Sequence, residues 1–215
     1  FPKFGDIVSV CDVDAQRLER AKDIVKGWHG KAPSATGDYR KIIDDPKVDV
    51  VHISTPDHWH AKIAIEAMLA GKDVYCEKPM TLTIEEGKLI CEVCKKTGAI
   101  FQVGTQQRST SQFVKAIALI REGRLGELKH VQCAIGGAPE SPELPIADVP
   151  KHLDWDRWLG PAANTEYRFK PDAPNIIGSW SRAHYEFRWW YEYSGGKLTD
   201  WGAHHVDIAT WGLGK

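Results

Sequence analysis

The first hundred residues alternate between short apolar segments and longer amphipathic ones, and this rhythm limits the possible folds more than any other feature. We expect strands at residues 6–10, 48–54, 73–77 and 99–104, and helices at residues 15–26, 58–70 and 83–96. Strands this apolar are usually buried on both faces, and strands that alternate with helices pair in parallel through right-handed crossovers. The chain therefore predicts an α/β fold with a doubly wound parallel sheet, which binds ligands beyond the carboxyl ends of its strands.

The pattern changes near residue 105. A helix is expected at residues 109–122, a strand at 126–137, a proline-rich irregular stretch at 138–174 and a last helix at 200–211. We assign residues 1–105 to a dinucleotide-binding domain, and residues 106–215 to the start of an α+β open-sheet domain for substrate binding and dimerisation.

A dinucleotide-binding sheet of the Rossmann type opens with a strand, a Gly-x-Gly-x-x-Gly turn and a helix. The segment FPKFGDIVSV at the start of this chain looks instead like the end of that crossover and the second strand. We therefore expect an internal fragment of a longer protein, with the first βα unit missing and the second domain truncated.

Composition narrows the possible functions. Lys and Arg number 28 against 29 Asp and Glu, so no charge excess favours nucleic acid or an anionic membrane. No apolar run approaches the ~20 residues that span a bilayer, and no signal peptide opens the chain. Because we expect the N-terminus to be missing, and any export signal with it, the compartment stays open between cytoplasm and bacterial periplasm. Cys91 and Cys94 lie mid-helix without a second cysteine pair, and we expect them to be reduced and buried.

Polar residues follow the first two predicted strands. Asp12 comes directly after the first, where a carboxylate can accept both ribose hydroxyls of adenosine and repel a 2′-phosphate. This favours NAD over NADP. In the alternative interpretation, Asp12 is a solvated turn residue or a helix cap. Ser54, Thr55 and Pro56 follow the next strand, at a helix N-terminus suited to an anion or a ribose. Thr55 and Asp57 could cap that helix.

His58 and His60 are spaced two residues apart, as metal ligands can be. No third ligand of matching geometry is near them in the sequence, so we expect no metal. We expect His60 to contact the cofactor or to pack on its helix.

The segment CEKP places Glu77 and Lys78 at the carboxyl end of the third strand. A lysine there points into the ligand crevice, where its charge can hold a substrate hydroxyl and lower the hydroxyl pKa. Glu77 can pair with Lys78 or bind the cofactor ribose.

The last helix carries Asp200 and His204, which share a face at about 100° per residue. An aspartate four residues before a histidine can orient it as a general base, although a polar interface face is an alternative. Seven of the nine tryptophans follow residue 150, and aromatic rings stack on sugars. Trp189, Trp190 and Tyr191 cannot all point one way, so we expect one or two at a substrate and the rest in core or subunit interface. An arrangement with all three in the core stays open.

The segments VCDVD, STPDHWHAKIAIEAMLAGKDVYCEKP and GGKLTDWGAHHVD together resemble the Gfo/Idh/MocA oxidoreductases. The resemblance implies a Rossmann domain joined to an open α/β domain, with NAD or NADP as cofactor and a sugar, inositol or polyol as substrate. It implies that Lys78, Asp200 and His204 are catalytic and also touch substrate. The FRWWYEYSGG run resembles a sugar-active bacterial branch, and we expect Arg188 and Trp189 at the substrate. A homo-oligomer is expected when the protein is full length.

Three functions remain open. The first is an NAD-dependent sugar or polyol dehydrogenase in which His204 takes the hydroxyl proton, Lys78 holds the oxygen and Asp200 orients His204. The second is a lyase or glycoside hydrolase that oxidises its substrate transiently and eliminates a group, without net NADH formation. The third is a non-catalytic sugar or dinucleotide sensor, which the intact lysine–aspartate–histidine set argues against.

Overall fold

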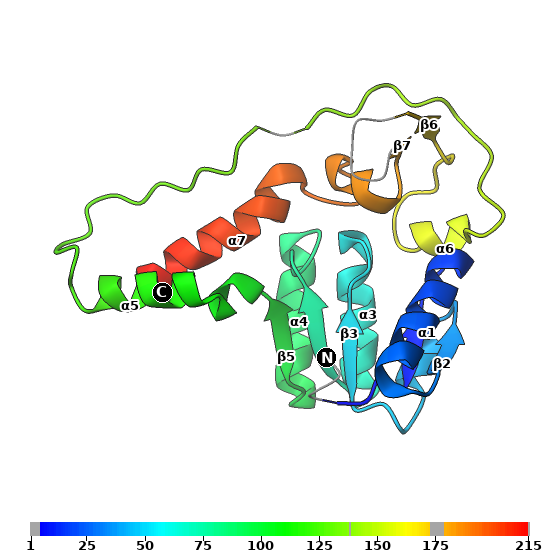
Figure 1. Cartoon of the computed structure of the whole chain (residues 1–215), viewed down its shortest axis with the longest axis horizontal. Coiled ribbons are helices and arrows are strands. Elements are labelled where there is room, and N and C mark those ends of the chain that lie inside the picture. The colour runs from blue at the N-terminus through cyan, green and yellow to red at the C-terminus, as the bar shows by residue number, and fades with distance from the viewer. Residues whose placement is uncertain (1–4, 138, 173–178, 215) are drawn as a thin grey trace.

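The computed structural model describes residues 5–137, 139–172 and 179–214 (Figure 1). Two parallel sheets lie side by side in its first half, one with two strands and one with three in the order β3-β4-β5. Their strands are β1 (Ser9–Cys11), β2 (Ser34–Thr36), β3 (Val50–Ile53), β4 (Asp73–Glu77) and β5 (Phe101–Gly104). The predicted α/β fold with parallel strands is confirmed. β2 was not predicted, because the segment SAT carries no apolar pattern.

Four helices accompany these strands, namely α1 (Ala15–His29), α2 (Arg40–Ile43), α3 (Asp57–Leu69) and α4 (Ile84–Thr97). α3 and α4 pack against each other behind the three-stranded sheet in the view of Figure 1, and α1 packs on β1 and β2. The core between α3, α4 and the sheet is apolar and includes Ile53, Ala64, Met68, Val74 and Ile90.

The predicted burial of every strand on both faces is wrong for β3. Side chains alternate along this strand, so Ile53 is buried toward the helices while Val50, on the other face, is 58% exposed. His52 shares the face of Val50 and is also exposed. It packs edge-on against Tyr75 of β4, with ring centroids 4.9 Å apart.

The helix termini follow local capping chemistry. Asp14 caps α1 by accepting from the backbone N–H groups of Gln16 and Arg17. Thr83 and Glu86 form the predicted capping box of α4. Cys91 on α4 is exposed and Cys94 only partly buried, so the predicted burial of this pair is wrong for Cys91.

α3 differs from its prediction at the N-terminus. Pro56 occupies the N-cap position, and no side chain among the described residues caps the helix, so the predicted caps from Thr55 and Asp57 are wrong. The Asp57 carboxylate instead accepts a hydrogen bond of 2.5 Å from the Ser194 hydroxyl, in a segment 137 residues later. Within the described part of the chain, the N–H groups of the first turn of α3 are therefore left without a side-chain acceptor.

The second half begins with η1 (Gln106–Ser109) and α5 (Ser111–Arg121). The strand predicted at 126–137 is wrong: these residues form neither strand nor helix, and no described segment pairs with them. Further along lie α6 (Trp155–Leu159), the antiparallel pair β6 (Phe169–Pro171) and β7 (Ser179–Ser181), η2 (His184–Trp189) and α7 (Gly196–Gly212). No helix in the described part of the chain has the length and apolar character needed to cross a bilayer.

An aromatic core holds this half together and binds it to the first. Trp155 and Trp158 stack with ring centroids 4.8 Å apart, and Tyr193 packs edge-on against Trp158. The carbonyl of Trp158 lies 3.0 Å from His58 Nε2 and accepts a 2.9 Å hydrogen bond from Trp59 Nε1. The N-terminal end of α3 is thus fixed to the second half of the chain.

Candidate active site

Lys78 and Asp200 meet at the carboxyl end of β4. α7 begins beyond the carboxyl ends of these strands (Figure 1), and Lys78 Nζ lies 2.5 Å from Asp200 Oδ1 and 3.1 Å from the Asp200 backbone oxygen. Both side chains are largely buried, with 14% and 10% of their surfaces exposed. The structure therefore brings together two residues that sequence analysis assigned to catalysis from opposite ends of the chain.

Asp200 is held by a second cation, which changes its expected role. Arg188 Nε lies 3.4 Å from the same oxygen, Oδ1 of Asp200. The guanidinium of Arg188 also packs over the rings of Tyr185 and Phe187, at 4.8 and 4.6 Å from their centroids. Asp200 thus accepts from Lys78 and pairs with Arg188, and it makes no described hydrogen bond to His204. We predicted that Asp200 orients His204, whereas in the structure Asp200 contacts Lys78 and Arg188.

His204 lies one turn further along α7 and is 8% exposed. Burial lowers its pKa below the ordinary value, and the charge of Lys78 lowers it further, while Asp200 acts in the opposite direction. Its Nδ1 is buried and has no hydrogen-bond partner among the described residues. A buried ring that is neutral near pH 7 and has an open nitrogen can accept a proton from a bound ligand.

The loop after β3 offers further polar groups to the same crevice. The Thr55 hydroxyl is buried and has no partner among the described side chains and backbone. Pro56 precedes the uncapped first turn of α3, whose N–H groups can face an anion or a ribose. Ser54 is exposed and its hydroxyl lies 3.1 Å from His52 Nε2. Thr55 and Pro56 therefore fit a dinucleotide better than Ser54 does.

Gln107 is a polar residue near a strand end that sequence analysis missed. It lies in η1, just after the carboxyl end of β5, and its Oε1 is buried without a partner in the described part of the chain. Its position beyond a strand end is the signal that could have identified it.

Glu77 stays close to its own strand. Its Oε2 accepts a 3.3 Å hydrogen bond from the backbone N–H of Lys78. A Cβ at Gly104, on the neighbouring strand β5, would come within 3.0 Å of the Glu77 carboxyl group. The glycine therefore makes room for this carboxylate beside Lys78.

The two acids after β1 have different environments. Asp12 is partly buried, accepts from the backbone N–H of Asp14 at 2.9 Å, and has a pKa raised mainly by burial. Asp14, the α1 cap, is 3% exposed and lies 3.1 Å from His152 Nδ1 and 3.4 Å from His184 Nε2. Asp14 is thus structural, whereas Asp12 keeps the position expected of a ribose acceptor.

The histidines of α3 contact backbone carbonyls. Within the described ranges, no group of three or more His, Cys, Asp or Glu side chains could hold a metal ion. His60 is 1% exposed, and its two ring nitrogens lie 2.7 Å from the Pro79 carbonyl and 2.8 Å from the Thr55 carbonyl. Both nitrogens are occupied, so the predicted direct contact of His60 with a cofactor has no polar atom left to make it.

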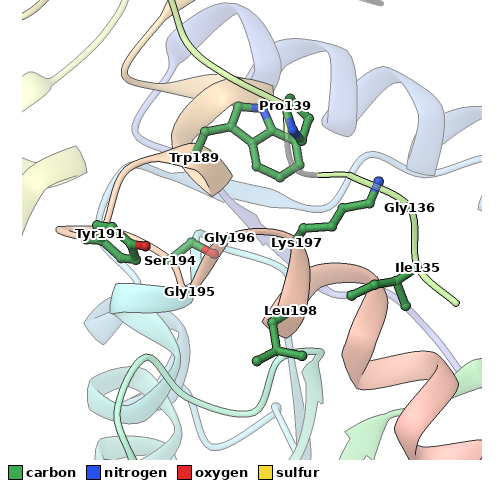
Figure 2. A pocket seen from close by; sticks show the side chains of 10 residues that line it. All are labelled: Ile135, Gly136, Pro139, Trp189, Tyr191, Ser194, Gly195, Gly196, Lys197 and Leu198. Atoms are coloured by element: carbon green, nitrogen blue, oxygen red, sulfur yellow. The ribbon is translucent and has the colours of Figure 1, made fainter. Parts of the chain in front are cut away.

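Two hollows lie near the start of α7 and share Leu198. One, of about 320 Å³, is lined by Lys78, Pro79, Thr105 and the small residues of α7. The other, of about 430 Å³, contains the Trp189 ring, the Lys197 side chain and the backbone of Gly195 and Gly196 (Figure 2). Of the aromatic run, Trp189 faces this hollow.

The two residues that follow Trp189 in the aromatic run pack differently from it. Trp190 packs against the second core under the Arg182 guanidinium, 4.0 Å from its centroid. Tyr191 borders the larger hollow, but it is 88% exposed. The prediction that one or two of these rings face a ligand is therefore compatible with the structure.

Comparison with known proteins matches both halves of the chain to one family. Residues 2–105 match GFO_IDH_MocA, an oxidoreductase family with an NAD-binding Rossmann fold, and residues 139–215 match the C-terminal α/β domain GFO_IDH_MocA_C2.

Two curated relatives illustrate the range of the matches. Levoglucosan dehydrogenase from Pseudarthrobacter phenanthrenivorans is 42% identical over 95 residues, which are 44% of this chain and 24% of that protein. A glycosyl hydrolase family 109 protein from Shewanella baltica is 33% identical over 133 residues, which are 60% of this chain and 29% of that protein. The matched part of the chain thus spans less than a third of either relative.

A solved structure matches over nearly the whole chain. Levoglucosan dehydrogenase in complex with NADH and L-sorbose aligns with a TM-score of 0.62 and 25% identity. The alignment covers 94% of this chain and 43% of that one.

Proposed function

Because this chain belongs to the Gfo/Idh/MocA oxidoreductase family, we propose that it transfers a hydride between NAD and a carbinol of a sugar or polyol. The observation that carries this proposal is the meeting of Lys78, Asp200 and His204 at the carboxyl end of β4. A buried lysine that is held in place and a neutral histidine with an open nitrogen form a proton acceptor beside an oxygen-binding cation.

The residues of this chain divide the work as follows. His204 takes the proton from the substrate hydroxyl through Nδ1, because this nitrogen is buried and has no described partner. Lys78 Nζ holds the substrate oxygen and stabilises the negative charge that develops on it. Asp200, anchored by Arg188, fixes the position of Lys78. When bound, NAD supplies the acceptor for the hydride of the carbinol carbon.

The residues present fit a nicotinamide dinucleotide at two places. The buried Thr55 hydroxyl and the uncapped first turn of α3 lie at the crevice end of β3, where they would hold a ribose or phosphate. Asp12 follows β1, where its carboxylate would accept the adenosine ribose hydroxyls. A carboxylate there disfavours a 2′-phosphate, so we propose NAD in preference to NADP.

A sugar substrate is supported by the hollow that contains the Trp189 ring, which shares Leu198 with the hollow lined by Lys78. The Trp189 ring offers an apolar face for stacking, and Lys197 offers an ammonium group at the same wall. The matched levoglucosan dehydrogenase structure contains NADH and L-sorbose. We propose Arg188 as an indirect contributor here, because its guanidinium is engaged by Asp200.

The direct test is NAD reduction by the intact protein. A panel of pyranoses, anhydrosugars, inositols and linear polyols is incubated with NAD, and NADH is followed by absorbance. We expect turnover with at least one member of the panel and its loss in Lys78→Ala. A panel that is silent in both the oxidation and the reverse direction would contradict the proposal.

The similarity to a glycosyl hydrolase family 109 protein favours one second candidate. In that case the same residues would support transient oxidation followed by elimination, with the cofactor returned to its starting state. The two reactions differ in their products. Cleavage of a glycoside without accumulation of NADH would identify this second reaction, and stoichiometric NADH would exclude it.

A further inference from the structure

A buried hydrogen bond joins α3 to the segment just before α7. The Ser194 hydroxyl donates to Asp57 Oδ2 over 2.5 Å, although 137 residues separate the two in the sequence. Asp57 is 4% exposed and Ser194 is 1% exposed. Because both groups are buried, loss of one leaves the other without water to replace it.

Asp57 belongs to the same packed unit as Lys78. Asp57 begins α3, which packs on β4, and Lys78 directly follows the last residue of β4. Ala64 of α3 and Val74 of β4 lie in one apolar core. A close-packed core resists small displacements, so the position of Asp57 is fixed relative to Lys78.

Ser194 lies where the chain enters α7 (Figure 2). Its backbone N–H donates to the Trp190 carbonyl at 3.0 Å, which holds it within its own segment. Gly195 follows directly as the N-cap of α7. Asp200 lies in the second turn of this helix and His204 one turn further. Ser194 therefore fixes the point from which α7 carries both residues into the site.

Aromatic contacts keep the same two segments together without this hydrogen bond. Tyr193 is buried, and its ring centroid lies 5.2 Å from that of His58 on α3 and 4.8 Å from that of Trp158. Apolar contacts are not directional, whereas a hydrogen bond needs a defined distance and angle. The rings thus hold the segments in contact, and the Asp57–Ser194 bond is suited to setting where α7 starts.

The charged groups of the site lie close to Asp57. Burial raises the pKa of Asp57, while the Ser194 hydrogen bond and positive charges that include Arg188 and Lys78 act in the opposite direction. The same two cations meet at Asp200, with Lys78 Nζ 2.5 Å and Arg188 Nε 3.4 Å from its Oδ1. A shift of α7 relative to α3 would move Asp200 away from Lys78, because Lys78 stays with α3 and β4.

We propose that Asp57 and Ser194 are positioning residues, whose hydrogen bond sets the start of α7 against α3. The pair thereby places Asp200 and His204 opposite Lys78. The placement of α7 is independent of the proposed function, whereas the effect of the pair on turnover rests on that function.

The placement is read at His204, whose pKa is lowered mainly by burial. The charged groups that act on it are, in decreasing order, Lys78, Asp200, Glu77 and His205. In Ser194→Ala, α7 should move away from Lys78, while Asp200 and His205 move with His204. The lowering by Lys78 exceeds the raising by Glu77 on the same strand end, so the His204 pKa should rise in a histidine NMR titration. An unchanged His204 pKa in the folded variant would overturn the proposal.

Turnover of Ser194→Ala should fall about 10- to 100-fold in kcat, with a smaller change in KM for the sugar substrate, because orientation and not binding is lost. Ser111→Ala, at an exposed position in the first turn of α5, is the matched control and should keep the native kcat and His204 pKa. An effect confined to KM would contradict positioning. A protein without dehydrogenase activity leaves the His204 readout intact, so failure of the proposed function is distinguishable.

Two substitutions at Asp57 separate the hydrogen bond from the charge. Asp57→Asn keeps an oxygen that accepts from the Ser194 hydroxyl, whereas Asp57→Ala does not. Asp57→Asn should therefore lie closer to the native protein in kcat and in His204 pKa. Asp23→Ala, at an exposed position on α1, controls for loss of an acid. Equal effects of the two Asp57 variants would overturn the role of the hydrogen bond.

The double variant Asp57→Ala/Ser194→Ala separates position from stability. Ser194→Ala leaves a buried carboxyl group without its donor, whereas the double variant removes both groups. Urea denaturation should therefore show the double variant to be at least as stable as Ser194→Ala, which keeps the test open should that variant fail to fold. Its kcat and His204 pKa should stay at the values of the single variants, because the placing contact is still absent. Recovery of a native kcat and His204 pKa together with stability would show a merely structural role and refute the proposal.

Discussion

Lys78 Nζ and Asp200 Oδ1 lie 2.5 Å apart although 122 residues separate them in the sequence. One residue ends a parallel strand of the first half, and the other lies in the first turns of α7. Neither is more than 14% exposed as a side chain, so loss of one partner leaves the other charge buried. Breaking such a pair typically costs about 3–5 kcal/mol, which ties the active site to the stability of the whole chain.

The first prediction is that two variants shift the pKa of His204 in opposite directions. Lys78→Met should raise the His204 pKa, because the lysine charge lowers it in the native protein. Asp200→Asn should lower it further, because the aspartate charge acts in the other direction. Histidine NMR titration of the two variants measures both effects. Shifts of the same sign would show that His204 does not lie between these charges.

The second prediction concerns the rate. Lys78→Ala and His204→Ala should each lower kcat by about 10²–10⁴, the usual effect of removing a positioned acid or base. The double variant should lose less than the product of the two, because the residues act on one oxygen. Lys88→Ala, on the exposed surface of α4, controls for loss of a lysine. NAD affinity should change far less than kcat in His204→Ala, and a native kcat there would contradict its role.

The third prediction is the pH profile of the reaction. His204 must be neutral to accept a proton, and burial together with the Lys78 charge lowers its pKa below the ordinary 6.5. kcat/KM for oxidation should therefore fall only as the pH drops below about 6.5, and this acid limb should move to higher pH in Lys78→Met. An acid limb centred well above pH 7 in the native protein would identify a different base.

Sequence periodicity predicted four of the five described parallel strands and the three long helices between them within a few residues, because apolar burial and local capping fix these elements. The lysine and the D-x-x-x-H spacing were also readable from the sequence. The partner of Asp200 was not, because helical spacing places His204 near it but cannot reveal Lys78 or Arg188 from distant segments. The strand expected at 126–137 failed for a related reason, since a strand needs a neighbour and no described segment pairs there.

The same limit applies to the buried polar groups. His60 looked like a cofactor contact because its position in the sequence follows a strand end. Its two carbonyl partners come from different loops, and no local sequence pattern predicts these contacts. Asp57 looked like a helix cap, but the Ser194 hydroxyl, 137 residues away, holds its carboxylate elsewhere.

The fourth prediction concerns acid stability and rests on His58, which is 2% exposed. Burial lowers its folded-state pKa from 6.5 to about 4, so the unfolded chain binds the extra proton more readily. The free energy of unfolding should therefore decrease as the pH falls from about 6.5 toward 4, by on the order of 3 kcal/mol from this residue.

His58→Gln removes the titrating ring and keeps a donor for the Trp158 carbonyl. Urea denaturation at pH 7 and pH 5 should show a smaller pH dependence in this variant than in the native protein. His130→Gln controls for the loss of an exposed histidine. An unchanged pH dependence in His58→Gln would mean that this ring is not buried in its neutral form.

The fifth prediction concerns Gly160, where the two halves of the chain meet. Its φ is 49°, and a Cβ there would overlap the Trp59 ring, whose Nε1 donates to the Trp158 carbonyl. Gly160→Ala should therefore displace the indole, break this hydrogen bond and add backbone strain. Gly30, the C-cap of α1, has a φ of 71°, and a Cβ added there would meet nothing within 4 Å, so Gly30→Ala isolates the backbone cost. We expect Gly30→Ala to cost about 1 kcal/mol and Gly160→Ala several times more in urea denaturation, because overpacking adds to strain. Equal costs would show that Trp59 does not fill the space above Gly160.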